Sequence, residues 1–133
     1  MAETNVLVVE DDDTIRRLLM DVLEQHATLI VDGARDGVEA LHQIATQPYG
    51  VIVLDLMMPK MSGVDFLDSL NALTSDPSVK SIEHPPNVIV ITAAADTDVP
   101  TATIASRCSL VREVFRKPLD VDGLAECVER YMS

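Results

Sequence analysis

The chain has 133 residues, a formal net charge of −12 and only two cysteines. This length fits a single domain with a sizeable core, and the negative charge disfavours direct binding to nucleic acid or to an anionic membrane surface. We therefore expect one domain over residues 1–133, without room for a second. Because the sequence has no CxxC pair, no signal-peptide pattern and no membrane-spanning apolar run, we expect this domain to lie in the reducing cytoplasm.

The first half of the chain alternates short apolar runs with helical patterns. Residues 5–9 predict a strand, and the acids that follow them predict the cap of a helix over about residues 14–25. Apolar spacing predicts the buried face of that helix: Ile15, Leu18, Leu19, Val22 and Leu23. A second strand over residues 28–31 leads through the Asp32-Gly33 and Asp36-Gly37 pairs into a helix with Val38, Leu41, Ile44 and Ala45 on one side.

The second half continues the same alternation. Residues 51–54 predict a strand covered on both faces, and a loop with Pro59 and Gly63 leads into a helix over about residues 63–73. An exposed, proline-containing connection over residues 74–87 precedes a strand at residues 88–91. A helix over residues 96–107, a strand over 111–116 and a helix over 120–132 follow. This order predicts a parallel sheet with helices on both faces.

Polar side chains follow four of the predicted strands: Glu10 and Asp11 the first, Asp55 the third, Thr92 the fourth and Lys117 the fifth. The carboxyl ends of parallel strands meet at one edge of a sheet, where such folds bind ligands. We therefore expect a site that combines carboxylates, a hydroxyl and an ammonium group. Such a site suits a divalent metal ion and a phosphoryl group.

These motifs resemble the receiver domain of bacterial two-component response regulators, in particular the chemotaxis regulators. The resemblance covers the whole chain and rests on Glu10-Asp11, on the segment Asp55-Leu56-Met57-Met58-Pro59-Lys60-Met61-Ser62-Gly63, on Thr92-Ala93 and on Lys117-Pro118. It implies an α/β fold of five βα units, (βα)5, with a doubly wound five-stranded parallel sheet in the flavodoxin-like order 2-1-3-4-5. We expect residues 1–133 to form a single receiver domain without an output domain.

The resemblance also implies a role for each site residue. Asp55 would accept a phosphoryl group from a histidine kinase or a phosphotransfer protein, with Mg²⁺ as the cofactor. Asp11, Asp55 and the backbone carbonyl of Met57 would bind the metal directly, and Glu10 would act through a water molecule.

Thr92 would hydrogen-bond a phosphoryl oxygen, and Lys117 would pair with Asp55 before phosphorylation and with the phosphoryl group afterwards. Phosphorylation would change the affinity for a downstream protein that the sequence does not identify. We expect no enzymatic activity beyond the domain's own phosphorylation and slow dephosphorylation.

Three further interpretations concern residues near this site. Asp12 and Asp13 are interpreted as helix-start residues, which satisfy free amide groups, and are left out of the metal site. The family commonly has an aromatic residue three positions before the lysine, whereas this chain has Val114 there. Phe115 should face the other side of the strand, so we expect switching through packing rather than through rotation of an aromatic ring.

Two other functions remain as alternatives. An aspartyl-phosphate phosphohydrolase commonly has a second aspartate two residues after the nucleophile, and Met57 occupies that position. A degenerate receiver that acts only as a binding module would not need the complete set of site residues that this chain has. The sequence also leaves open whether the chain is a stand-alone regulator, a phosphorelay shuttle or part of a longer protein.

Overall fold

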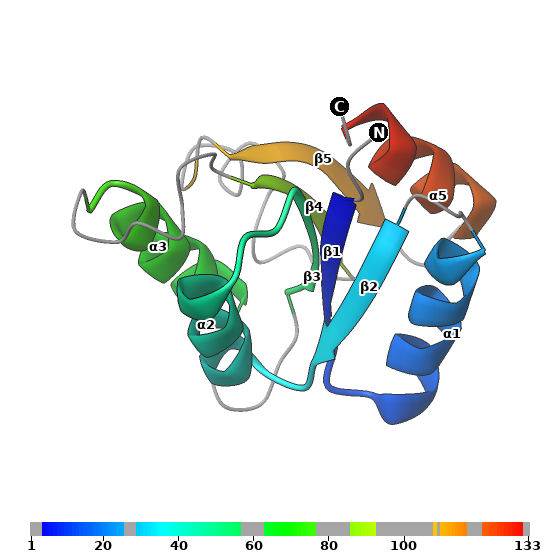
Figure 1. The fold of residues 1–133 in the computed structure, drawn as a ribbon, viewed down its shortest axis with the longest axis horizontal. Coiled ribbons are helices and arrows are strands. Elements are labelled where there is room, and N and C mark those ends of the chain that lie inside the picture. The colour runs from blue at the N-terminus through cyan, green and yellow to red at the C-terminus, as the bar shows by residue number, and fades with distance from the viewer. Residues whose placement is uncertain are drawn as a thin grey trace.

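Five parallel strands form one sheet at the centre of the molecule (Figure 1). The computed structural model describes residues 4–25, 29–56, 63–76, 86–92, 108, 110–116 and 121–131. The strands lie in the order β2-β1-β3-β4-β5. Their bounds are Thr4–Val9 (β1), Leu29–Ala34 (β2), Val51–Asp55 (β3), Asn87–Thr92 (β4) and Val111–Arg116 (β5). The predicted α/β class and the flavodoxin-like strand order are confirmed.

Helices cover both faces of this sheet (Figure 1). On one face lie α1 (Asp13–Glu24) and α5 (Val121–Arg130), and on the other lie α2 (Gly37–Thr46) and α3 (Gly63–Thr74). Successive strand residues point to opposite faces, so the core has two clusters. Val6 and Val8 belong to the α1–α5 cluster, while Leu7 and Val9 belong to the α2–α3 cluster. The helix predicted over residues 96–107 falls outside the described residues.

The middle strands are buried on both faces, as their apolar sequences predict. Every residue of β3 is buried, and so is every residue of β4 after Asn87. Both strands end in a polar residue, Asp55 in β3 and Thr92 in β4, with 3% and 2% of their surface exposed. The sheet thus brings a carboxyl and a hydroxyl group to its edge while shielding both from bulk water.

The predicted buried faces of two helices are partly wrong. In α1, Leu19 and Leu23 are buried, but Leu18 is 52% exposed. In α2, Val38 is 55% exposed and Ala45 is also exposed, whereas Gly37, Ala40 and Ile44 are buried. Apolar spacing alone did not distinguish this face from the neighbouring one.

The second strand is longer than the sequence predicted. It continues through Asp32 and Gly33 to Ala34, because it pairs with β1 along the whole of that strand. Asp32 accepts hydrogen bonds from the Tyr49 hydroxyl at 2.8 Å and from Gln47 Nε2 at 3.1 Å. A polar group is therefore accommodated within this edge strand, where the sequence predicted the connection to the next helix.

The two cysteines lie in different clusters of the core. Cys108 packs in the α2–α3 cluster and Cys127 in the α1–α5 cluster, and both are free thiols. The sheet separates them, so one disulfide cannot join them in this fold. Among the described residues, no helix has the length and the apolar character needed to cross a bilayer.

Candidate functional site

The first two acids of the site lie where β1 ends. Glu10 follows Val9, and its backbone N–H donates to the Ala34 carbonyl oxygen of β2 at 3.0 Å, which extends the pairing by one residue. Glu10 is 3% exposed, whereas the next residue, Asp11, is exposed. The chain therefore presents one buried and one solvent-facing carboxyl group at this edge.

The third acid arrives from the neighbouring strand. Val9 of β1 is in register with Leu54 of β3, so Glu10 and Asp55 follow paired residues. One carboxylate oxygen from each of Glu10, Asp11 and Asp55 lies within 4.8 Å of the other two. The structure thus brings these three predicted site residues together. Three carboxylates at such separations suit a hard divalent cation, which prefers oxygen ligands.

This acidic group stands apart from the other candidate ligands. Within the described ranges, it is the one cluster of three or more acidic, histidine or cysteine side chains with a spacing that suits a metal ion. His42 is exposed on α2, while His26 and His84 fall outside the described residues. Hence the part of the chain that the structure describes offers no histidine triad as a competing site.

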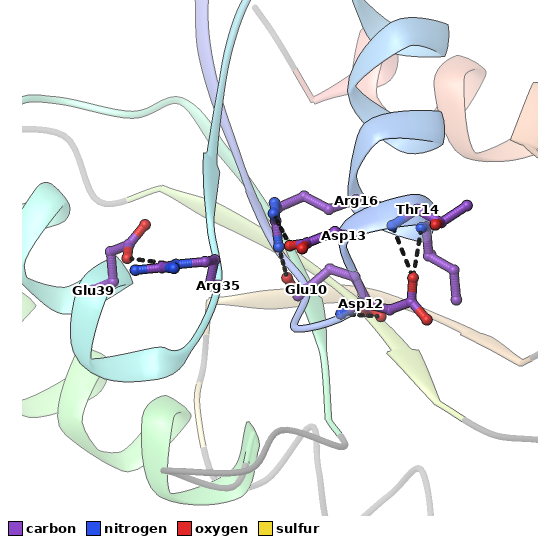
Figure 2. A network of polar contacts seen from close by, with 8 residues as sticks. Glu10, Asp12, Asp13, Thr14, Arg16, Arg35 and Glu39 are labelled. Atoms are coloured by element: carbon purple, nitrogen blue, oxygen red, sulfur yellow. Dashed lines mark hydrogen bonds and ion pairs between the residues drawn. The ribbon is translucent and has the colours of Figure 1, made fainter.

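Asp12 and Asp13, the two acids that follow Asp11 in the sequence, lie at the start of α1, as predicted. Asp12 caps the helix, because its Oδ1 accepts hydrogen bonds from the backbone N–H groups of Thr14 at 2.9 Å and Ile15 at 3.0 Å (Figure 2). Asp13 lies in the first helical turn and forms an ion pair with Arg16. Asp12 also donates its backbone N–H to Glu10 Oε1 at 3.4 Å, so the cap lies against the cluster of Glu10, Asp11 and Asp55.

Thr92 ends the strand on the other side of Asp55. Asp55 is in register with Ile91, and Thr92 is the next residue along β4. The backbone N–H of Leu56 donates to the Ile91 carbonyl oxygen at 3.0 Å, which holds the two strand ends together beyond Asp55. Thr92 therefore lies at the same edge of the sheet as the acids.

Two predicted site residues fall outside the described residues, namely Met57 and Lys117. The register of the sheet still locates the strand end from which Lys117 follows. Thr92 pairs with Arg116, the last residue of β5 and the one immediately before Lys117. The roles of Met57 and Lys117 stay predictions.

Val114 and Phe115 face opposite sides of the sheet, as the sequence predicted. Val114 packs against the α2–α3 cluster and Phe115 against the α1–α5 cluster, on the other side of the sheet. A register shift between β4 and β5 pairs Val88 with Val111 and Ile89 with Glu113, which leaves one extra residue in β5. Because Phe115 lies on the other side of the sheet from Val114, it cannot take the place of an aromatic ring at position 114.

Arg16 is a site neighbour that sequence reasoning missed. Its Nη1 donates to the backbone carbonyl oxygen of Glu10 at 2.9 Å (Figure 2). The spacing between Asp13 and Arg16 was a signal for their ion pair, because residues three apart meet on a helix surface. No sequence pattern indicated the contact with Glu10, since it depends on how α1 packs beside the end of β1.

A comparison with family models gives one match that covers most of the chain. The model described as the response regulator receiver domain matches residues 6–129.

Curated relatives include proteins of different lengths. The chain is 30% identical over 125 residues to a probable chemotaxis protein CheY of Rhizobium etli, and the match covers 93% of this chain and 88% of that protein. It is 30% identical over 121 residues to the response regulator ArlR of Staphylococcus epidermidis, where 91% of this chain matches 49% of the relative. It is 31% identical over 115 residues to a protein-glutamate methylesterase/protein-glutamine glutaminase of Myxococcus xanthus, where 86% of this chain matches only 30% of the relative.

Solved structures share the fold over almost the entire length. The receiver domain of a Francisella response regulator has a TM-score of 0.77 and 28% identity, with 98% of this chain and 97% of that chain covered. The signal receiver domain of a LuxO repressor-like protein from Vibrio parahaemolyticus has a TM-score of 0.80 and 25% identity, with coverages of 98% and 90%.

Proposed function

The chain belongs to the family of response regulator receiver domains, and on this premise we propose that Asp55 is the residue that accepts the phosphoryl group, with Mg²⁺ as the cofactor. The observation that carries this proposal is the convergence of Glu10, Asp11 and Asp55, whose carboxylate oxygens lie within 4.8 Å of one another. Three carboxylates so close together repel one another, and a bound divalent cation relieves that repulsion.

The donor atoms fit Mg²⁺, which is held in proteins by one or two carboxylates together with water and phosphate oxygens. We assign direct binding to Asp11 and Asp55 and to the backbone carbonyl of Met57, and binding through water to Glu10. When bound, the metal ion would neutralise negative charge on the phosphoryl oxygens and the acceptor carboxylate. The burial of Glu10 and Asp55 supports these roles, because a partly dry site strengthens charge interactions.

Asp55 is suited to be the nucleophile because it is held at the end of a fully buried strand. In the proposed step a carboxylate oxygen of Asp55 forms a bond to the phosphorus of a phosphohistidine on a histidine kinase or phosphotransfer protein. The phosphorus–nitrogen bond breaks, and its electron pair stays on the departing imidazole. The product is an aspartyl phosphate, a mixed acid anhydride.

Thr92 and Lys117 are proposed to recognise the transferred group. The Thr92 hydroxyl would donate to a phosphoryl oxygen, which the pairing of β4 beside β3 supports. Lys117 would pair with Asp55 before transfer and with a phosphoryl oxygen afterwards, placing positive charge where negative charge develops. The place of Lys117 directly after β5 supports this role.

Phosphorylation would be transmitted to a downstream protein through packing around Val114. This side chain is only partly buried against the α2–α3 cluster, and it lies on the strand next to the one that Thr92 ends. A shift of Thr92 toward the phosphoryl group would change how β4 and β5 pack. We propose this route because a valine has no ring that could rotate between an inward and an outward position.

The proposed unit is one receiver domain over residues 1–133, working in the cytoplasm. A single sheet with both faces covered supports the single domain. The low cysteine content, two in 133 residues, supports a reducing compartment. The domain's catalysis would be limited to its own phosphorylation and slow dephosphorylation.

The test is to incubate the protein with acetyl phosphate, with and without Mg²⁺, and to follow the intact mass. We expect one phosphoryl adduct that requires Mg²⁺ and is absent in Asp55→Asn. Asp21→Asn is the matched control, because Asp21 is an exposed acid in the middle of α1. An adduct that forms equally well in Asp55→Asn would contradict the proposal, and rapid multiple turnover of acetyl phosphate would favour a hydrolase.

A further inference from the structure

The guanidinium group of Arg16 reaches from α1 back to the end of β1 (Figure 2). Nη1 donates to the backbone carbonyl oxygen of Glu10 at 2.9 Å, and Nη2 donates to Asp13 Oδ1. Only 16% of the Arg16 side chain is exposed, whereas Arg17 beside it is an exposed residue. Arg16 is therefore a mostly buried cation that joins the start of the helix to the end of the strand.

The contact with Glu10 fixes the backbone between two acids of the proposed metal site. The carbonyl of Glu10 and the N–H of Asp11 belong to one planar peptide group, so a hydrogen bond to that carbonyl restrains the orientation of both residues. On its other side, Glu10 donates its N–H to the Ala34 carbonyl oxygen at 3.0 Å. Both backbone polar groups of Glu10 are thus held, one by β2 and one by Arg16.

We propose that Arg16 is a positioning residue for the Mg²⁺ site: it holds the peptide between Glu10 and Asp11 so that their carboxylates converge with that of Asp55. This inference rests on the proposed function of these acids. Arg16 acts on the metal only through Glu10 and Asp11. The planar fork of a guanidinium suits this task, because two of its nitrogens donate in fixed directions to the Glu10 carbonyl and to Asp13.

Gly33 leaves the space that this arrangement needs. A Cβ at position 33 would lie 3.1 Å from Arg16 Cδ and 2.8 Å from Met20 Sδ. The second distance is shorter than real contacts of this kind, so a side chain there would require the flexible end of Met20 to move and the Arg16 stem to shift slightly. The glycine of the edge strand thus allows α1 to bring Arg16 against the end of β1.

Charge and positioning make opposite predictions for the loss of Arg16. A cation beside a metal site repels the metal, so charge alone predicts that removing Arg16 strengthens Mg²⁺ binding. Positioning predicts weaker binding, because losing a partner that orients a metal ligand typically lowers affinity about 10- to 100-fold. An open pocket of about 380 Å³, lined by Asp13, Arg16, Arg17, Met20 and Arg35, admits water that partly replaces the guanidinium. We therefore expect a weakening of about tenfold.

The experiment measures Mg²⁺ affinity by isothermal titration calorimetry for the wild type, Arg16→Met, Arg16→Lys and Arg17→Met. Methionine keeps much of the side-chain length without the charge. Arg17→Met is the matched control, since it removes the same charge one residue away, and within the described part of the chain the Arg17 side chain makes no hydrogen bond or ion pair. We expect about tenfold weaker binding in Arg16→Met, partial recovery in Arg16→Lys and unchanged or slightly tighter binding in Arg17→Met. Equal or tighter binding in Arg16→Met would overturn the proposal.

Amide hydrogen exchange of the metal-free proteins tests the positioning without relying on Mg²⁺. We expect Arg16→Met to speed exchange at the N–H groups of Glu10 and Asp12, which donate to Ala34 and Glu10, while the N–H of Val53 in the core is unaffected. Unchanged exchange at Glu10 and Asp12 would overturn the role of Arg16. If the wild type binds no Mg²⁺, the proposed metal site fails, and the exchange result still decides whether Arg16 holds this turn.

Discussion

Replacing Asp11 with asparagine should stabilise the metal-free protein and remove its response to Mg²⁺. The carboxylate oxygens of Glu10, Asp11 and Asp55 lie within 4.8 Å of one another. At that separation two unit charges repel by about 0.9 kcal/mol at the dielectric constant of water, and by about 3.5 kcal/mol at an effective constant of about 20. Asp11 is exposed, so the smaller value applies to each of its two pairs. Because Lys117 is expected to offset part of the charge on Asp55, we predict a gain of about 1 kcal/mol.

With Mg²⁺ bound, the wild type should be more stable than Asp11→Asn, the reverse of their order without metal. A cation that binds only the folded state at 100 times its dissociation constant stabilises that state by about 2.7 kcal/mol. We expect this gain for the wild type and only a small part of it for Asp11→Asn. Urea titrations followed by circular dichroism at low ionic strength, with and without Mg²⁺, give the free energy of unfolding of each protein. They measure both the stability gained by Asp11→Asn without metal and the stability that each protein gains from Mg²⁺.

Asp12→Ala is the matched control for this experiment. Asp12 accepts two backbone hydrogen bonds as the cap of α1, and the loss of such a cap costs about 1 kcal/mol. We therefore expect Asp12→Ala to be less stable than the wild type while it keeps the full response to Mg²⁺. The reasoning is refuted if Asp11→Asn is destabilised without metal, or if Asp12→Ala and Asp11→Asn lose the Mg²⁺ response to the same extent.

Three further outcomes follow from individual contacts. Gly33→Ala should lower the free energy of unfolding by no more than about 1 kcal/mol in urea titrations, because its methyl group meets only the end of the Met20 side chain, at 2.8 Å, and Arg16 Cδ, at 3.1 Å, and both side chains can shift; a loss of about 3 kcal/mol would contradict this account of the packing. Burial and the neighbouring Asp32 raise the pKa of Tyr49, so the folded state retains that proton longer than the unfolded state. Stability should accordingly fall as the pH rises above about 10, and this fall should be smaller in Tyr49→Phe, as measured by unfolding at several pH values. Burial raises the pKa of the Cys108 and Cys127 thiols, so both should react at least about tenfold more slowly with a thiol reagent near neutral pH than after unfolding; fast reaction in the folded protein would contradict their burial.

The strand ends were the most predictable part of the molecule. A parallel sheet brings all carboxyl ends to one edge, so the alternation of strands and helices was enough to predict that Glu10, Asp11 and Asp55 would meet. The capping role of Asp12 was predictable for a similar reason, since it depends on contacts within one helical turn. Features that follow from local geometry and strand direction could therefore be read from the sequence.

Features that depend on packing between elements could not be predicted from the sequence. Leu18 and Val38 have the spacing of buried residues, yet both are exposed, because the tilt and rotation of a helix on a sheet choose among overlapping apolar faces. Asp32-Gly33 was expected in the connection after the second strand, but the pairing of β2 with β1 extends the strand through both residues. The contact of Arg16 with Glu10 combines the position of α1, the space left by Gly33 and the end of β1, and no single segment encodes it.

The most direct test of the central claim is to identify the phosphorylated residue. Borohydride reduces an aspartyl phosphate to homoserine, so treatment of the phosphorylated protein followed by peptide mass spectrometry locates the acceptor. We predict that homoserine forms at position 55 only, and only when both acetyl phosphate and Mg²⁺ are present. Homoserine at Asp11 or another aspartate, or its complete absence from protein that carries a phosphoryl adduct, would contradict the assignment of Asp55 as the phosphoacceptor.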